Sequence, residues 1–300
     1  MKWEEILCEL CHSPMIASQL LQKNDDKAVF KTMFENGMIL IVKCVSHKET
    51  AQRLEHEAQI CAMIRKFDPS FPCPTPFFIG EKNGNVIYIQ KYQNGVTLRQ
   101  FHPNNKMKTD FCVQMVLLLK RMAVLPVLGN EAKVLFKEST KDYTEHIGNM
   151  KIQLNQVAPP VAYEMGLQWL QEHSMCIENT EQSVVVHNDL NSDNILIDIE
   201  SDTVCLIDFE HALLGDPLKD VSKMVWHFQR DPKLGRIFRR QYYTAFPDVS
   251  EERLKWYVLY DVLQHFTQYH TLIKRKGWKQ YFDEEEDMMK HICKGDALIW

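Results

Sequence analysis

The chain contains 300 residues, of which 45% are hydrophobic and 25% charged, proportions that are ordinary for a folded protein and exclude a disordered or fibrous chain. Its length suffices for one large domain or two lobes with ample core. The formal net charge of −5 argues against a nucleic-acid partner and favours cationic ligands.

No apolar run is long enough to cross a membrane, and the acidic, amphipathic segment 1–10 does not have the composition of a signal peptide. The nine cysteines are scattered within apolar segments, as expected for reduced thiols. We therefore expect a cytoplasmic protein with no membrane partner.

A short helix is predicted over residues 2–11, and it contains an unusual cysteine pattern. Cys8 and Cys11 form, with His12, the CxxCH sequence of covalent haem attachment. That chemistry requires export, and no second ligand pair has the spacing of a metal site. The two cysteines also have the spacing of a buried helix face, so we interpret them as core residues.

Three strands follow the helix, indicated by apolar and β-branched runs, over residues 15–23, 27–34 and 38–45. The sequence Glu-Asn-Gly at 35–37 predicts a tight turn that joins the second and third strands as a hairpin. The loop between the first two strands, residues 23–27, reads Lys-Asn-Asp-Asp-Lys and can also form a tight turn.

Lys43 lies within the third strand among β-branched neighbours, and a helix is predicted after it over residues 47–67. The lysine is either a solvated charge on an edge strand or a group held to meet phosphates. Glu49, Glu55 and Glu57 on the helix offer it partners.

A proline-rich crossing leads from this helix to two further strands, predicted over residues 77–81 and 86–92. Mainly helical sequence follows. We therefore expect a hinge near residues 90–96, between an N-terminal lobe (1–95) and a C-terminal lobe (97–300).

The most informative segment is HNDLNSDN at residues 187–194, followed by LIDFE, which contains Asp208. Apolar strands predicted over 194–199 and 203–209 form a hairpin around a polar turn. The hairpin would bring Asn194 and Asp208 close together, with Asp189 on the loop that leads into it.

These three side chains suit phosphoryl transfer. One carboxylate can orient or deprotonate an attacking hydroxyl, which is the role available to Asp189. An amide oxygen and a second carboxylate, those of Asn194 and Asp208, can hold Mg²⁺ against nucleotide phosphates.

The arrangement resembles the kinase-like phosphotransferases of small molecules, such as aminoglycoside phosphotransferases and choline or ethanolamine kinases. In that family HxDxxxxN is followed by a strand ending in Asp and then by a DPxxD segment, here Asp216 to Asp220. The resemblance implies an α+β, bilobal protein-kinase-like fold. A small antiparallel sheet lobe with one helix would precede a larger, mainly helical lobe.

The resemblance also implies the role of each residue in the motif. Asp189 would be the catalytic base, and Asn194 and Asp208 the magnesium ligands. His187 would be a structural member of the loop, and Asp220 a supporting carboxylate.

For the nucleotide, the resemblance implies that Lys43 pairs with a helix glutamate and touches the α- and β-phosphates of ATP. Glu57 fits the helix pattern best, and Glu55 remains open. The backbone between Gln90 and Tyr92 would bond the adenine edge.

One departure from the family concerns the loop at residues 23–27, where relatives often have glycines. Asp25 and Asp26 would repel phosphates if they pointed inward. A competing hypothesis is therefore a nucleotide-binding scaffold, or pseudokinase, that transfers nothing.

Seven helices are predicted in the C-terminal lobe: 107–125, 139–156, 161–177, 216–230, 233–245, 250–275 and 283–293. A protein kinase would have a long segment after its second metal ligand. Here Glu210 and Asp216 follow Asp208 closely, and the extra sequence lies before the motif. This favours a small-molecule hydroxyl as acceptor.

The acceptor itself is less constrained. Carboxylates such as Asp261 and the acidic run 283–287 can bind ammonium groups of an aminoglycoside-like molecule, our first hypothesis. Aromatics such as Trp256, Tyr257 and Tyr260 can instead cage a choline-, ethanolamine- or thiamine-type alcohol. Both sets have simpler interpretations, as solvated helix acids and as core side chains.

Overall fold

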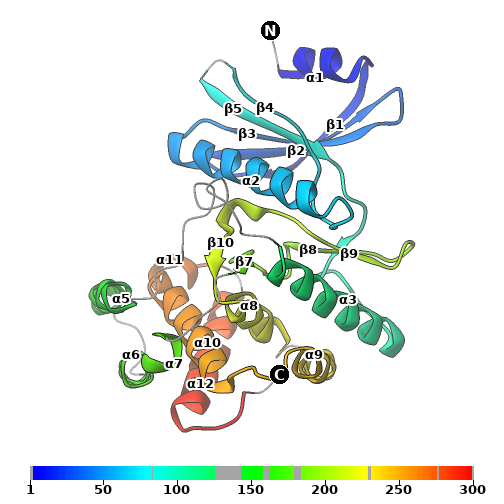
Figure 1. Cartoon of the computed structure of the whole chain (residues 1–300). Coiled ribbons are helices and arrows are strands. Elements are labelled where there is room, and N and C mark those ends of the chain that lie inside the picture. The colour runs from blue at the N-terminus through cyan, green and yellow to red at the C-terminus, as the bar shows by residue number, and fades with distance from the viewer. Residues whose placement is uncertain are drawn as a thin grey trace. The chain divides into compact units, whose positions relative to one another are not determined.

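The computed structural model describes residues 3–82, 84–125, 143–157, 162–178, 184–228, 231–275 and 277–298 (Figure 1). These residues form two compact units. The continuous part of the first unit runs past the hinge predicted at residues 90–96 to His102, and this unit also contains Ser192–Ala212. The second unit contains Pro103–Ala123, the described residues up to Asn191, and the chain from Leu213 onward.

The first unit is built on an antiparallel sheet with the strand order β1-β2-β3-β5-β4. Its strands are β1 (Met15–Lys23), β2 (Lys27–Phe34), β3 (Ile39–Val45), β4 (Pro76–Lys82) and β5 (Asn85–Lys91). The predicted turn between β2 and β3 is confirmed: Gly37 has a φ of 80°, and the Phe34 N–H donates to the Met38 carbonyl at 3.0 Å. This turn sets the register, in which Lys27 pairs with Val45 and Met33 with Ile39.

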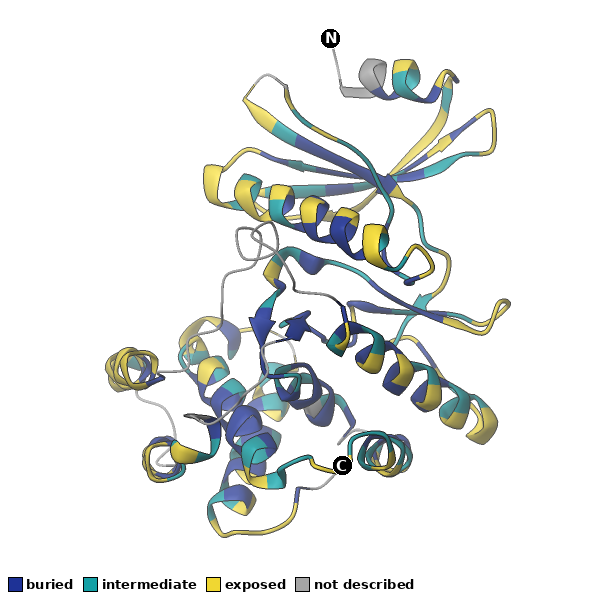
Figure 2. Ribbon diagram, in the orientation of Figure 1, coloured by how far each residue is buried: buried dark blue, intermediate teal, exposed yellow. Residues whose placement is uncertain are grey.

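Each face of this sheet packs against a helix. On one face Leu7 and Cys11 of α1 (Trp3–Cys11) pack with Leu40 and Val42, so Cys11 is the core residue predicted, while Cys8 is half-buried. On the other face lies α2 (Lys48–Phe67), whose Leu54 and Ala58 join a core cluster with Val45 and Tyr88. The side of α2 that faces the sheet is buried and its outer side is exposed (Figure 2).

The predicted hairpin after the HNDLNSDN motif is also present in the first unit. Strands β8 (Ile195–Asp198) and β9 (Thr203–Leu206) pair antiparallel and add the short β6 (Val96–Thr97) at the edge of β8. Gly95 precedes β6 with a φ of 131°, and a Cβ there would lie 2.8 Å from the Ile197 carbonyl oxygen. Only glycine allows this close approach. A short 3₁₀ helix, η1 (Phe209–His211), follows β9.

The second unit is mainly helical, with one short antiparallel pair formed by β7 (Val184–Val186) and β10 (Leu213–Gly215). Its helices are α3 (Asn105–Ala123), α5 (Thr144–Val157), α6 (Ala162–Glu172), α7 (Met175–Glu178), α8 (Leu218–Phe228), α9 (Pro232–Ala245), α10 (Glu251–Phe266), α11 (Tyr269–Leu272) and α12 (Trp278–Cys293). No helix among the residues that the structure describes is both long and apolar enough to span a bilayer.

Some helix boundaries differ from the prediction, and the helix expected over 161–177 is divided into α6 and α7. The helix expected over 250–275 ends at Phe266 and is followed by the separate α11. The last helix begins at Trp278, after Gly277 in a left-handed conformation, and not at residue 283. The helix predicted over 139–156 is described only from Thr144 onward. The α+β class, with an antiparallel sheet and helix followed by mainly helical sequence, is confirmed.

Candidate nucleotide and metal site

The register of the sheet decides which side chains share the face next to α2. Residues directly opposite each other in an antiparallel pair point to the same face, as does every second residue along a strand. Lys27 pairs with Val45, and Lys43 pairs with Tyr88. Gln90 follows Tyr88 by two positions. Lys27, Lys43 and Gln90 therefore lie on one face.

Lys43 forms a buried ion pair with Glu57, which lies in the middle of α2. Its Nζ lies 2.8 and 2.6 Å from the two carboxylate oxygens of Glu57, which is 0% exposed, and 2.6 Å from Oδ1 of Asp208. Of the glutamates left open by the sequence, Glu49 and Glu55 are exposed, so Glu57 is the partner in the structure.

The protonation of this pair follows from burial and charge. Burial alone would lower the pKa of the Lys43 ammonium, but the carboxylates of Glu57 and Asp208 outweigh it and the pKa is raised. Burial raises the pKa of Glu57 to about 7, against the lowering influence of Lys43. The lysine is therefore a fixed positive charge.

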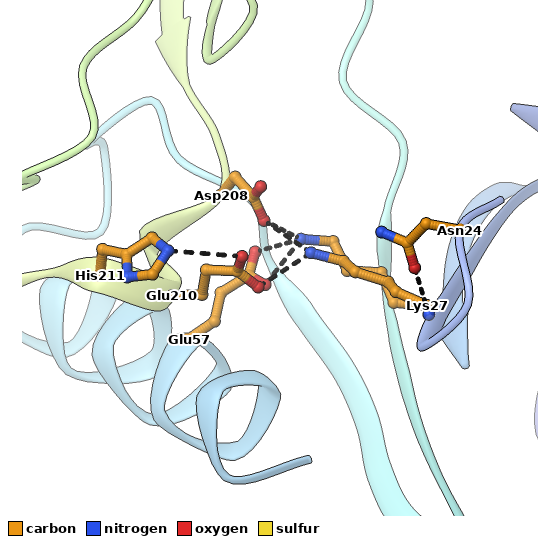
Figure 3. Close-up of polar contacts among 7 residues, drawn as sticks. Asn24, Lys27, Glu57, Asp208, Glu210 and His211 are labelled. Atoms are coloured by element: carbon orange, nitrogen blue, oxygen red, sulfur yellow. Dashed lines mark hydrogen bonds and ion pairs between the residues drawn. The ribbon is translucent and has the colours of Figure 1, made fainter. Parts of the chain in front are cut away.

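Lys43, Glu57 and Asp208 form a charged cluster, and a second lysine, Lys27, joins it. The sequence pattern did not single out Lys27. The Nζ of Lys27 lies 2.8 Å from Oε2 of Glu210 and 3.5 Å from Oδ1 of Asp208 (Figure 3). The Lys27 side chain is 10% exposed. Asp208 itself has left-handed backbone angles, φ 67° and ψ 59°. Such conformations are uncommon outside glycine and concentrate at functional sites.

The cluster has an excess of negative charge. Carboxylate oxygens of Glu57, Asp208 and Glu210 lie within 4.8 Å of one another, and two lysines face these three acids. Asn194, at the start of the hairpin, is largely buried and lines one cavity with Asp208. Its backbone carbonyl accepts from the Ile207 N–H at 3.0 Å. An amide and a carboxylate are the hard oxygen donors that Mg²⁺ takes alongside substrate phosphates. The donor set therefore fits the predicted metal.

A cavity of about 330 Å³ within the first unit brings these groups together. Its volume lies at the lower end of the range typical for small-molecule sites. The polar side chains that line it include Lys27, Lys43, Gln90, Tyr92, Asn194 and Asp208, and the apolar ones are Leu21, Val29, Ile41, Leu196 and Ile207.

Gln90 lines this cavity and has a buried side-chain oxygen that is unsatisfied. The residue is 5% exposed, and its Oε1 is buried without a hydrogen-bond partner among the residues described. A buried acceptor left unpaired costs about 1–3 kcal/mol, so a ligand that donates to it once the side chain turns into the cavity would be favoured.

The strand end beside Gln90 limits which backbone groups can meet a ligand. The Lys91 N–H donates to the Thr75 carbonyl at 3.0 Å, and the Tyr92 N–H donates to the Ile39 carbonyl at 3.1 Å. These two amides, which the resemblance to the family had assigned to the adenine edge, are thus engaged within the protein. The Tyr92 ring lies against Lys31, whose Nζ is 3.8 Å from the ring centre.

The loop that lacks glycine forms a turn closed by its own asparagine. Oδ1 of Asn24 accepts from the Asp26 N–H at 3.0 Å and the Lys27 N–H at 2.6 Å. Asp25 and Asp26 are exposed, and Asp26 lies 3.2 Å from His47. The two carboxylates thus point into solvent, and two of the loop amides are already bonded.

The loop that contains Asp189 belongs to the second unit and is held by Asp220 of α8. The buried Asp220 carboxylate accepts from the His187 N–H at 2.8 Å and the Asn188 N–H at 2.7 Å. Asn188 has a φ of 62°, and the Asn191 side chain donates to Oδ1 of Asp189 at 3.1 Å. Asn194 and Asp208 lie in the first unit, so the meeting of all three predicted residues stays a prediction.

We expect Asp220→Asn to lower the free energy of unfolding by about 1–3 kcal/mol. The NH2 group that replaces one carboxylate oxygen cannot accept a hydrogen bond, so one of the two backbone N–H groups is left unpaired. Urea denaturation measures the change. Asp248→Asn, at an exposed position of the same unit, is the control and should stay within about 0.5 kcal/mol of wild type. Equal effects of the two substitutions would contradict the role given to Asp220.

Comparison with known proteins places this fold among the phosphotransferases. The sequence profile of the phosphotransferase enzyme family matches residues 25–257. The chain therefore belongs to this family, as the resemblance of its motifs implied.

Solved structures agree in fold at low identity. Aminoglycoside phosphotransferase APH(4)-Ia, in complex with AMP-PNP and hygromycin B, is 19% identical with a TM-score of 0.71, and 97% of each chain is covered. The GDP and kanamycin complex of an APH(2'') enzyme is 15% identical with a TM-score of 0.66, covering 98% of each chain. The ADP-bound APH(2'')-Ib is 17% identical with a TM-score of 0.64, and 95% of each chain is covered. The predicted kinase-like fold is thereby confirmed.

Proposed function

We propose that the protein transfers the γ-phosphate of ATP, with magnesium, to a hydroxyl of a small cationic molecule. The observation that carries the proposal is the convergence of Lys43, Glu57 and Asp208 on a cavity that Asn194 also lines. A cation fixed beside oxygen donors for a metal is what phosphate binding requires.

Each residue has one task in the proposed reaction. Lys43, held by Glu57, neutralises the α- and β-phosphates, and Asn194 and Asp208 would hold the magnesium. Magnesium, when bound, supplies further neutralisation of the charge that develops on the phosphates.

The chemical step needs a base for the acceptor hydroxyl, and we assign it to Asp189. The acceptor oxygen forms its bond to the γ-phosphorus as the bond to the β-phosphate oxygen breaks, and ADP leaves. Asp189 orients the hydroxyl and accepts its proton. Asp220 fixes the loop on which this carboxylate lies, because it binds two of the loop amides.

Gln90 supports adenine as the base. Its unpaired Oε1, once turned into the cavity that Gln90 lines, would accept from the exocyclic amine of adenine, whereas guanine presents a carbonyl oxygen at the equivalent position. The apolar residues around it, such as Ile41 and Leu196, supply the flat contacts that an aromatic ring needs.

The acceptor is proposed to be an aminated, aminoglycoside-like molecule, and an amino alcohol of the choline type is second. The aromatic residues suggested as a cage for choline, Trp256, Tyr257 and Tyr260, are buried in the core. This argues against them as a binding site for a choline-type ammonium group. The Trp256 indole N–H donates to the Leu170 carbonyl at 2.9 Å, as a core residue would. Several solved structures of similar fold are aminoglycoside phosphotransferases, and one contains kanamycin.

The acidic candidates are also partly engaged. Asp261 binds Lys223 at 2.7 Å and the Ser222 hydroxyl at 2.7 Å. Within the acidic run, Glu285 is fully buried and binds His265 at 2.6 Å. Asp283 and Asp287 of the same run are exposed, but each is paired with a lysine, Asp283 with Lys279 at 2.8 Å and Asp287 with Lys290 at 3.8 Å.

Magnesium-dependent formation of ADP from ATP, measured with a panel of aminoglycosides and amino alcohols, tests this function. We expect one class of acceptor to raise turnover well above the rate with water alone. Turnover that no member raises, together with intact binding of MgATP, would favour the nucleotide-binding scaffold. A chain that binds no nucleotide would contradict both.

A further inference from the structure

Lys27 is the first residue of β2, and its position in the sheet fixes where its side chain points. Lys27 lies opposite Val45 of β3, and Lys43 is two residues from Val45 on that strand. Lys27 and Lys43 therefore share a face of the sheet. The bond from the Lys27 N–H to Asn24 closes the turn immediately before it. Lys27 thus extends toward Asp208 and Glu210 (Figure 3). It lines the cavity that Lys43 and Asp208 also line.

The surroundings of Lys27 repeat those of Lys43. Lys43 is held by Glu57 at 2.6 Å, and Lys27 is held by Glu210 at 2.8 Å. Each ammonium also faces Oδ1 of Asp208, at 2.6 Å from Lys43 and 3.5 Å from Lys27. Asp208 therefore lies between two lysine–glutamate pairs.

A surface ion pair does not explain this arrangement. The Lys27 and Glu210 side chains are only 10% and 15% exposed, so both charges have lost most of their hydration. A buried pair of this kind adds little net stability over apolar side chains of similar size. The cavity beside it points to a ligand that gains from the cation.

The turn before β2 makes a lysine useful at this position. In phosphate-binding loops, backbone N–H groups commonly hold the phosphate oxygens. Here the N–H groups of Asp26 and Lys27 are both bonded to Asn24. A side-chain cation can replace the contacts that these amides would have made.

We propose that Lys27 is a second phosphate-binding cation, which Glu210 holds in place for the phosphate chain of the nucleotide. This inference rests on the proposed function and assigns to it a residue outside the family motif. A lysine ammonium has three N–H donors, so Lys27 can keep Glu210 and also donate to a phosphate oxygen. The bond to Glu210 restricts the side chain before the ligand arrives, which lowers the cost of ordering it.

The test compares Lys27→Ala with Lys23→Ala in equilibrium binding of MgATP and of adenosine to the whole chain. Lys23 is exposed and lies opposite Ala28 in the same hairpin, and it does not line the cavity. We expect Lys27→Ala to weaken MgATP binding by about 10- to 100-fold, the loss typical of a charge-assisted hydrogen bond. Adenosine, which has no phosphate, should bind the variant within about twofold of wild type, and Lys23→Ala should bind both ligands as wild type does.

Lys27→Met keeps most of the aliphatic stem and serves as a second variant if the alanine substitution prevents folding. It should show the same selective loss of MgATP binding. Wild-type affinity for MgATP in a folded Lys27 variant would overturn the inference. So would tighter binding, because Lys27 would then be a cation that competes with magnesium for Asp208. If the wild-type chain binds neither MgATP nor adenosine, it is the proposed function that fails.

Discussion

Replacing Asp189 with alanine is expected to lower turnover by about 100- to 10,000-fold, the usual contribution of a general base. Binding of MgATP should change little, because the ligands proposed for the nucleotide lie on other residues, such as Lys43 and Asn194. Steady-state kinetics with any accepted acceptor give the first quantity, and equilibrium binding of MgATP gives the second.

Asp189→Asn makes the same test with less change of shape. Its amide oxygen can still accept the bond that the Asn191 side chain gives to Oδ1, so the loop should keep its conformation. Only the charge and the capacity to accept a proton are lost. Turnover equal to wild type in either variant would remove Asp189 from the mechanism.

Lys43→Met is expected to lower both stability and activity. The substitution leaves Glu57 at 0% exposure without its cation, and breaking a buried ion pair in this way costs about 3–5 kcal/mol in the free energy of unfolding. Turnover should fall at least about 100-fold, because the phosphates lose a fixed positive charge. Urea denaturation and steady-state kinetics measure the two effects.

A double variant separates the two roles of Lys43. In Lys43→Met combined with Glu57→Gln the buried charge is gone, so most of the lost stability should return while activity stays low. Lys48→Met, at an exposed position at the start of α2, is the control and should change stability by less than about 0.5 kcal/mol. Full activity in the double variant would show that Lys43 acts only as the partner of Glu57.

Much of the first unit could be predicted from sequence because its signals are local. The Glu-Asn-Gly turn and the alternation of apolar residues give β2 and β3 within one residue of their observed bounds. The helical period of α2 identifies Glu57 as a residue of its buried face. The pairing of Lys43 with a helix glutamate came from the resemblance to the family, and the local pattern favoured Glu57 as that glutamate.

Lys27 was missed although part of its signal was in the sequence. A turn centred on residue 36 pairs Lys27 with Val45, and positions two apart share a face, so Lys27 and Lys43 belong together. Its contact with Glu210 joins residues 183 positions apart, and no local pattern encodes that distance. The loop was interpreted through the charges of Asp25 and Asp26, which in fact point into solvent.

The end of the chain shows a different limit. The acidic run 283–287 was interpreted as the start of a helix, but Gly277 sets the start earlier and places the run inside α12. Glu285 is consequently a buried residue paired with His265 on α10. Its burial depends on how two helices pack, which the composition of the run could not reveal.

The hairpin of β8 and β9 has a consequence for how this chain can vary. The Ile207 N–H donates a hydrogen bond to the Asn194 carbonyl at the base of the hairpin. This bond fixes the backbone of Asn194 next to that of Ile207, which precedes Asp208, the other proposed magnesium ligand. The turn at residues 199–202 lies at the opposite end of the ladder. Insertions there would leave the separation of the two oxygen donors unchanged, whereas a one-residue slip inside either strand would turn the ligand to the wrong side. Length variation among natural relatives and designed variants should therefore be tolerated at the tip of this hairpin and excluded from its base.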